Sequence, residues 1–216
     1  MRSPLVPLAV ALAALAVVLA VVLAPSPVVA APAPPEPLTR AHLLTLEDHV
    51  VVYPDMRDPL RIAMRSPVFA PRGCEDQGVA VRGSSAIAGS VSPDGQRRSV
   101  ALIDQNLVRF GSVRQARALV QRYRDFSKRC VGDVDTDDGE GGDVRLKNRA
   151  WFPPLVGDES AGMVIGWFQS GSADWRRVLV VRTGRTVSVL DVSFTDVRPP
   201  ARGVLALGRL AVGRLG

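Results

Sequence analysis

The stretch RRVLVVRTGRTVSVLDVSF, residues 176–194, decides the fold class. It predicts two strands, Arg176–Arg182 and Thr186–Phe194, because both halves are rich in β-branched residues. Only Thr183 and Gly184 and one further residue separate the halves, which is the length of a hairpin turn. Strands joined by so short a turn must pair antiparallel, so the stretch predicts an antiparallel sheet.

Further elements are found outward from this hairpin. After Ser112, which can cap a helix, apolar residues follow at helical spacing as far as Cys130. The other expected helices are Leu38–Asp48 and Val204–Leu215, and the other expected strands are Gly78–Val91, Arg98–Phe110, Arg145–Phe152 and Gly162–Gln169. The expected order is therefore α-β-β-α-β-β-β-β-α. This order predicts an α+β fold in which helices cover a single antiparallel sheet of about six strands.

The N-terminal segment predicts export. Arg2 precedes an uncharged run of Leu, Ala and Val, and Val28-Val29-Ala30 matches a signal-peptidase site. We therefore expect residues 1–30 to be a signal peptide or, since the apolar run is long, an uncleaved signal anchor. Residues 31–37 are a Pro/Ala-rich spacer, and residues 38–216 form a single extracytoplasmic domain, secreted or membrane-anchored.

Composition excludes two classes of protein. Of all residues 47% are apolar, enough to exclude an intrinsically disordered chain. The sequence has no second long uncharged run, which excludes a polytopic membrane protein.

The two cysteines fit an oxidising compartment. Cys74 and Cys130 form the only pair that the sequence offers, so the default expectation outside the cytoplasm is one disulfide. The alternatives are a metal site or a redox pair. The sequence has no CxxC motif, the spacing that is typical of both alternatives.

Several of these features resemble a known family. They are Phe110-Gly111-Ser112, the Ala-rich helix that ends in Phe126-x-x-x-Cys130, a following strand with Arg149, and a terminal Ala/Leu helix. In this order they resemble the PknH-like extracellular sensor domains of actinobacterial receptor kinases and envelope proteins. The resemblance implies a non-catalytic, extracytoplasmic ligand-binding role, with Cys130 and its partner Cys74 as structural positions.

Catalytic motifs are absent from the sequence. It contains no GxSxG, no phosphate-binding loop and no HExxH. We therefore expect that the protein is not an enzyme and has no catalytic residue and no cofactor. His42 and His49 are the only imidazoles, and we expect both to be partly exposed surface residues. A secreted hydrolase without a recognisable linear motif, working through two carboxylates, stays open as the alternative.

An acidic segment follows Cys130. Six carboxylates lie among glycines between Asp133 and Asp143, and the spacing of the first three imitates the start of a calcium loop. Positions six and twelve of that loop need Gly and Glu, but here they are Asp138 and Val144. We therefore expect a flexible surface loop and no metal site, with a looser calcium site as the alternative.

The strand after this segment carries a basic stripe. Period-two alternation places Arg145, Lys147, Arg149 and Trp151 on one face, and the formal net charge of the chain is +6. Such a stripe suits an anionic envelope ligand, either a lipid headgroup or a cell-wall polymer, and the four residues are our candidate ligand-binding site. We expect no nucleic-acid partner outside the cell. The alternative interpretation is an ordinary solvated face of an antiparallel sheet.

Overall fold

The computed structural model describes residues 36–56, 61–64, 68–71, 73–74, 78–92, 102–137 and 142–215. They all belong to one compact unit that begins at Pro35. The expected signal segment 1–30 and residues 31–35 of the expected spacer lie outside the described residues. Among the helices that are described, none has the length and apolar character needed to cross a membrane.

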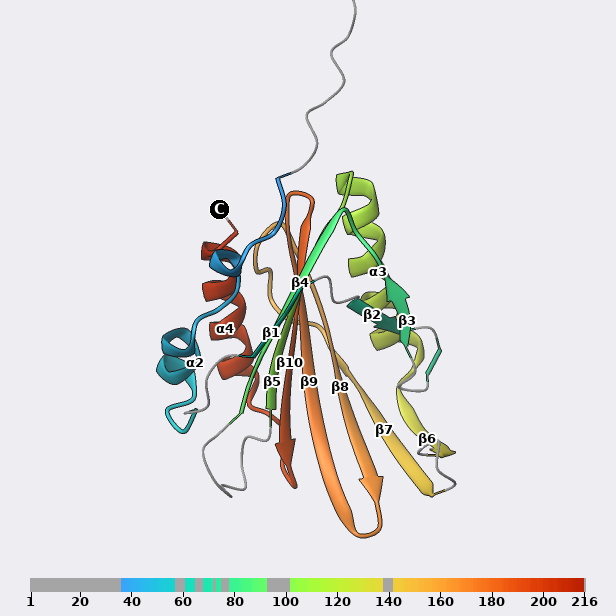
Figure 1. Ribbon diagram of the computed structural model, residues 1–216. Coiled ribbons are helices and arrows are strands. Elements are labelled where there is room, and N and C mark those ends of the chain that lie inside the picture. Colours follow the sequence, from blue (N-terminus) through green and yellow to red (C-terminus); the bar gives the residue numbers. More distant parts are fainter. Residues whose placement is uncertain are drawn as a thin grey trace, which may run out of the picture. The chain divides into compact units, whose positions relative to one another are not determined.

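Eight strands of the described chain form one sheet, and every neighbouring pair in it runs antiparallel (Figure 1). Their order across the sheet is β1-β4-β5-β10-β9-β8-β7-β6. The bounds are Arg61–Met64 (β1), Ser85–Val91 (β4), Leu102–Arg109 (β5), Gly132–Asp137 (β6), Asp143–Trp151 (β7), Glu159–Gln169 (β8), Ser172–Thr183 (β9) and Thr186–Thr195 (β10). A separate two-stranded sheet pairs β2, Val68–Pro71, with β3, Gly78–Val81.

The α+β class is confirmed, but the expectation of about six strands is wrong, and the element order differs. The expected strand Gly78–Val91 is in fact two strands in different sheets, interrupted at Arg82-Gly83-Ser84. The first part of the acidic segment, Asp133–Asp137, also lies in a strand, β6, in which aspartates alternate with Val134 and Thr136, whereas residues 138–141 lie outside the described residues. A charged strand is tolerated there because β6 is at the sheet edge, where charges discourage pairing with another chain.

The long helix α3, Val113–Arg129, carries the chain from β5 in the middle of the sheet to β6 at its edge. Four antiparallel connections then return the chain from β6 to β10, which pairs with β5. Ser112 caps α3 as predicted, since its Oγ accepts a hydrogen bond of 3.3 Å from the backbone N–H of Gln115.

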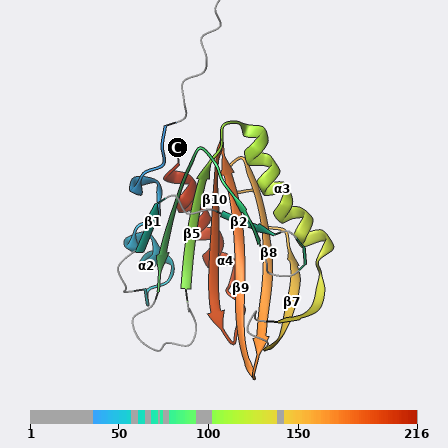
Figure 2. The same cartoon turned by 45° about the vertical axis from the view of Figure 1, so that its right-hand side comes forward.

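Helices cover both faces of the sheet (Figures 1 and 2). β9 shows how one strand serves two cores: Val178 and Val180 pack beneath α3, whereas Leu179 and Val181 pack beneath α4, Ala201–Gly213. A strand buried on both faces reads as a continuous apolar run, which is why Val178–Val181 has no polar residue. We call the two sides of the sheet the α3 side and the α4 side, after the helix that covers each.

The first helix starts later than expected. The range Leu38–Asp48 contains only a short 3-10 turn, Arg40–His42, and the start of α2, Leu46–Val52. A capping box explains the start of α2, because the Thr45 hydroxyl and the Asp48 carboxylate each bind the other's backbone N–H.

Candidate functional site

Strand β7 alternates as the stripe predicts. Leu146 and Asn148 are buried on the α3 side. Arg145, Lys147 and Arg149 lie on the α4 side, where pairing with β8 sets them opposite Phe168, Gly166 and Val164. Helix α4 packs mainly on β9 and β10, and in Figure 1 strands β7–β9 extend past the ends of both long helices. We call the α4 side of β7, β8 and the first half of β9 the open face.

Acidic residues of β6 neutralise part of the basic stripe. The Arg145 side chain donates a hydrogen bond of 2.8 Å to Asp135, and Arg149 lies 3.2 Å from Asp133. The hydrogen bond and the charge of Asp135 raise the pKa of the Arg145 guanidinium. The expectation of a flexible acidic loop is therefore wrong for Asp133–Asp137, which is a strand paired with β7.

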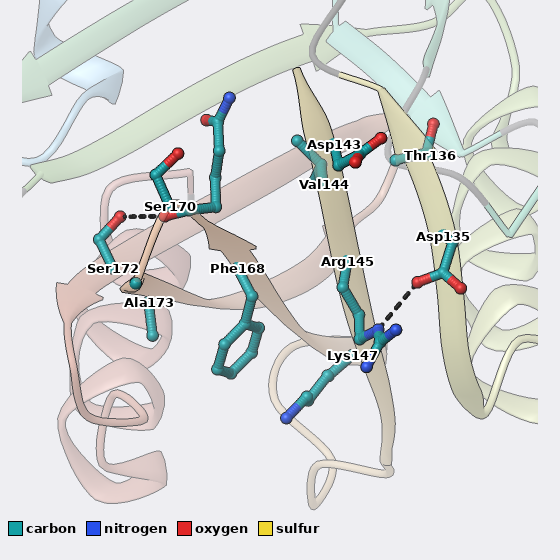
Figure 3. A pocket seen from close by; sticks show the side chains of 12 residues that line it. Asp135, Thr136, Asp143, Val144, Arg145, Lys147, Phe168, Ser170, Ser172 and Ala173 are labelled. Carbon is teal, nitrogen blue, oxygen red and sulfur yellow. Dashed lines mark hydrogen bonds and ion pairs between the residues drawn. The ribbon is translucent and has the colours of Figure 1, made fainter.

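A pocket of about 690 Å³ lies at the end of the open face (Figure 3). Arg145 and Lys147 line it together with the ring of Phe168 and the hairpin tip that connects β8 to β9. Its complete lining is Asp135, Thr136, Asp143, Val144, Arg145, Lys147, Phe168, Gln169, Ser170, Gly171, Ser172 and Ala173. The structure thus brings two of the four predicted site residues into one pocket and leaves Arg149 and Trp151 outside it.

Aromatic rings form a layer on glycines of β8. A Cβ atom at Gly162 would lie 2.5 Å from the ring of Trp151. At Gly166 it would lie 2.7 Å from Phe168 and 2.9 Å from Trp175. The rings of Phe168 and Trp175 meet edge to face, with centroids 5.4 Å apart. Since real Cβ atoms essentially never come so close to other atoms, the glycines are what lets these rings lie against the strand.

Each ring carries a cation on its outer side. Lys147 Nζ lies 4.1 Å from the Phe168 centroid. The guanidinium of Arg177 lies 4.6 Å from the Trp151 centroid, and that of Arg198 lies 4.5 Å from the Trp175 centroid. The open face is therefore a two-layer surface, with aromatic rings below and positive charges above.

Sequence reasoning missed much of this surface. Two neighbouring strands supply most of it: Phe168 belongs to β8, and Trp175 and Arg177 belong to β9. These residues lie near β7 because of the register of β8 on β7, which the sequence does not reveal across the seven-residue connection 152–158. Arg198 lies beyond the last strand, where no periodicity applies. The spacing of Gly162 and Gly166 was the available signal, because two glycines four residues apart leave two gaps on one face of a strand.

The histidines do not form a site. His49 is buried, with an exposed fraction of 1%, so the expectation of a surface residue is wrong for it. Burial lowers its pKa to about 4, against a smaller opposite effect of Asp48. Within the described residues there is no group of three His, Cys, Asp or Glu side chains that could hold a metal ion.

A pair of carboxylates lies elsewhere, on the α3 side. Asp104 of β5 and Asp191 of β10 are directly opposite each other in the register. Arg176 forms an ion pair with Asp191, and Asp104 lines a smaller pocket of about 350 Å³ with Asn106. Burial and the charge of Asp191 raise the pKa of Asp104 to about 6, although Arg176 opposes the shift.

This raised pKa predicts a pH-dependent stability. The folded protein holds the Asp104 proton more tightly than the unfolded chain, so the stability contributed by protonation is present below about pH 4 and is lost as pH rises through about 6. Asp104→Asn should therefore raise the free energy of unfolding at neutral pH by about 1–2 kcal/mol. At about pH 4 the variant and wild type should have the same free energy of unfolding. Urea titrations at both pH values test this, and an equal difference at both would contradict it.

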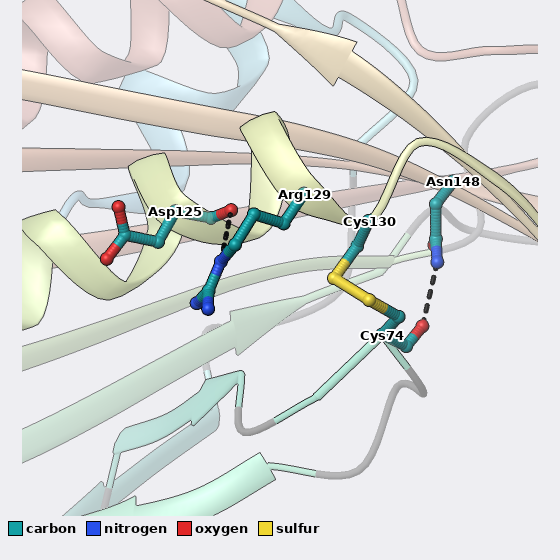
Figure 4. Close-up of a disulfide and its surroundings, with 5 residues drawn as sticks. All are labelled: Cys74, Asp125, Arg129, Cys130 and Asn148. Carbon is teal, nitrogen blue, oxygen red and sulfur yellow. Dashed lines mark hydrogen bonds between the residues drawn. A yellow bond between two sulfur atoms is a disulfide. The ribbon is translucent and has the colours of Figure 1, made fainter.

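The disulfide lies on the α3 side (Figure 4). Cys130 at the end of α3 is bonded to Cys74, with Cα atoms 4.9 Å apart. Cys74 lies between β2 and β3, so the bond joins the helix to the small sheet and not directly to the large one. Asn148 completes the link to β7, because its side-chain amide donates a 2.7 Å hydrogen bond to the Cys74 carbonyl.

This fold is known from an extracellular domain. It is similar to the crystal structure of the extracellular domain of PknH from Mycobacterium tuberculosis, with a TM-score of 0.62. The likeness covers 83% of this chain and 97% of that chain at 14% sequence identity, so what the two share is the fold. The expected resemblance is confirmed at this level. No family model matches the sequence, and no curated protein does.

Proposed function

We propose that this chain is an exported, non-catalytic, sensor-like domain that binds an anionic ligand of the cell envelope. Its fold is similar to that of an extracellular domain, and its two cysteines are bonded, which fits an extracytoplasmic location. In this proposal the N-terminal segment exports the domain or tethers it to the membrane. The contact surface is the open face, including Arg145, Lys147, Arg149 and Trp151.

The observation that carries the proposal is the pocket at the end of this face. It combines two cations, an aromatic ring and the polar hairpin tip 169–173, a mixture typical of ligand sites. Lys147 has no carboxylate partner among the described residues, so its charge is available to an anion.

Binding of wild type to envelope fractions tests the proposal. We expect binding to cell-wall polymers or anionic vesicles that weakens as salt rises, because exposed charges are screened over about 10 Å at 0.1 M ionic strength. Arg145→Ala with Arg149→Ala should weaken it several-fold, since the double change removes two cations and leaves Asp135 and Asp133 unpaired. Unchanged binding by this variant would make the stripe a solvated sheet face.

A hydrolase is the second candidate, and the Asp104–Asp191 pair is the observation that favours it. Two neighbouring carboxyl groups, one of which has a raised pKa, are an arrangement that acid–base hydrolysis can use. Release of reducing sugar or of acid from an envelope fraction by wild type, abolished in Asp104→Asn, would establish the hydrolase and refute the non-catalytic proposal.

A further inference from the structure

The cations of the open face fall into two groups. Arg145 and Arg149 have carboxylate partners in β6. Lys147, Arg177 and Arg198 have none among the described residues, and each of them lies on an aromatic ring. The unbalanced positive charge therefore lies over the rings of Phe168, Trp151 and Trp175, and of the three cations in the predicted stripe only Lys147 contributes to it.

Arg177 is held in a setting that an anion would improve. Its Nε donates a hydrogen bond of 2.7 Å to the Pro199 carbonyl, and its guanidinium rests on Trp151. Burial and the neighbouring charge of Arg198 lower its pKa. A guanidinium that is partly buried beside a second one is destabilised by desolvation and repulsion, and a bound anion relieves both.

The three cations are close enough to serve one extended ligand. Lys147, Gly166 and Trp175 are side by side in the register, and Arg177 is two residues further along β9. With strands about 4.8 Å apart and about 3.3 Å per residue, the Cα atoms of Lys147 and Arg177 lie roughly 12 Å apart. That separation suits a chain with repeated charges better than one small ion.

We propose that Lys147, Arg177 and Arg198 form a binding surface for an anionic glycan, whose carboxylate or phosphate groups bind the cations while its sugar rings contact the pocket. The inference rests on the proposed function and names its ligand class. The pocket supports a glycan because its lining combines hydroxyl, amide and carboxylate groups, which exchange hydrogen bonds with sugar hydroxyls, with the ring of Phe168.

The position of the surface favours a glycan over the membrane surface. The described chain begins at Glu36, whose carbonyl accepts a hydrogen bond of 2.6 Å from Arg109 beside the β9–β10 turn. The pocket is lined by residues 169–173 at the opposite end of β9, about 36 Å away at about 3.3 Å per residue. Figure 1 shows the β8–β9 turn at the end of the sheet opposite to the β9–β10 turn. A tether at the N-terminal segment would therefore attach at the end of the domain remote from this pocket, which favours a ligand other than the bilayer that holds the tether.

Charge-matched variants test the surface. Arg177→Gln and Arg198→Gln remove unbalanced cations, whereas Arg145→Gln and Arg149→Gln remove balanced ones, and all four change the net charge equally. The probes are oligogalacturonate, a glycan that carries carboxylates, phosphomannan, a glycan that carries phosphates, a neutral galactan, and vesicles of phosphatidylcholine with phosphatidylglycerol.

We expect wild type to bind one or both anionic polymers, and the neutral galactan far more weakly. Arg177→Gln and Arg198→Gln should each weaken that binding about tenfold, which is about 1.4 kcal/mol. The two matched controls should weaken it about threefold or less, the effect of a screened, exposed charge. Arg198 is exposed, so its variant keeps the test valid if the Arg177 variant melts early.

Three outcomes would overturn the inference: equal losses in all four variants, no binding of either anionic polymer, or tighter binding of vesicles than of both polymers. Failure of the proposed function is different, because it shows as the absence of salt-sensitive binding to any envelope fraction. A different result is binding that is unchanged in Arg177→Gln and Arg198→Gln but lost in Arg145→Ala with Arg149→Ala. That result would refute the inference and leave the proposed function standing.

Discussion

Replacement of Cys74 and Cys130 by alanine should lower the free energy of unfolding by about 4 kcal/mol. The bond joins residues 56 positions apart, and opening a loop of that length restores entropy to the unfolded chain. For a domain of this size, about 4 kcal/mol corresponds to a melting temperature lower by about 10 °C.

Thermal unfolding of wild type with and without reductant is the first measurement. Reduced wild type should have the same melting temperature as the alanine variant. Oxidised wild type should have a melting temperature well above both. Intact mass should differ by two hydrogens between the two wild-type forms. Coincident melting of all three samples, or thiol labelling of the unreduced protein, would show that the cysteines are not bonded in the protein.

The sequence predicted those features that depend on near neighbours in the chain. The hairpin through Thr183 and Gly184 and the cap at Ser112 need only a few residues each, and both are present in the structure. The alternation of β7 is equally local, so Arg145, Lys147 and Arg149 do share one face.

Features that depend on distant register could not be predicted. Asp135 pairs with Arg145 because β6 is a strand. The sequence did not predict this strand, because aspartate is uncommon in β-strands and β6 contains three of them. The expected helix Leu38–Asp48 ends before His49, so His49 was expected at the surface. In the structure α2 begins eight residues later and includes His49, whose side chain is buried. Arg198 reaches the open face only because the chain turns back after β10.

Trp175→Ala should be the most damaging change on the open face, at about 3–5 kcal/mol of unfolding free energy. Its ring is almost fully buried, with an exposed fraction of 7%, although no helix covers this part of the face. Gly166 lies beneath it, Phe168 meets it edge to face, and Arg198 covers it. Removal of so large a buried ring leaves a cavity whose neighbours relax only in part.

A double-mutant cycle with Gly166→Ala separates this packing from general loss of a large side chain. Alone, Gly166→Ala should destabilise by about 1–3 kcal/mol, because the new methyl group meets the rings of Trp175 and Phe168. In the Trp175→Ala background the methyl group enters the vacated space, so the double variant should be more stable than the sum of the single changes predicts. Urea titrations of the four proteins measure the coupling. Strict additivity would mean that the tryptophan does not rest on the glycine, and the two-layer surface of rings and cations would then lose its foundation.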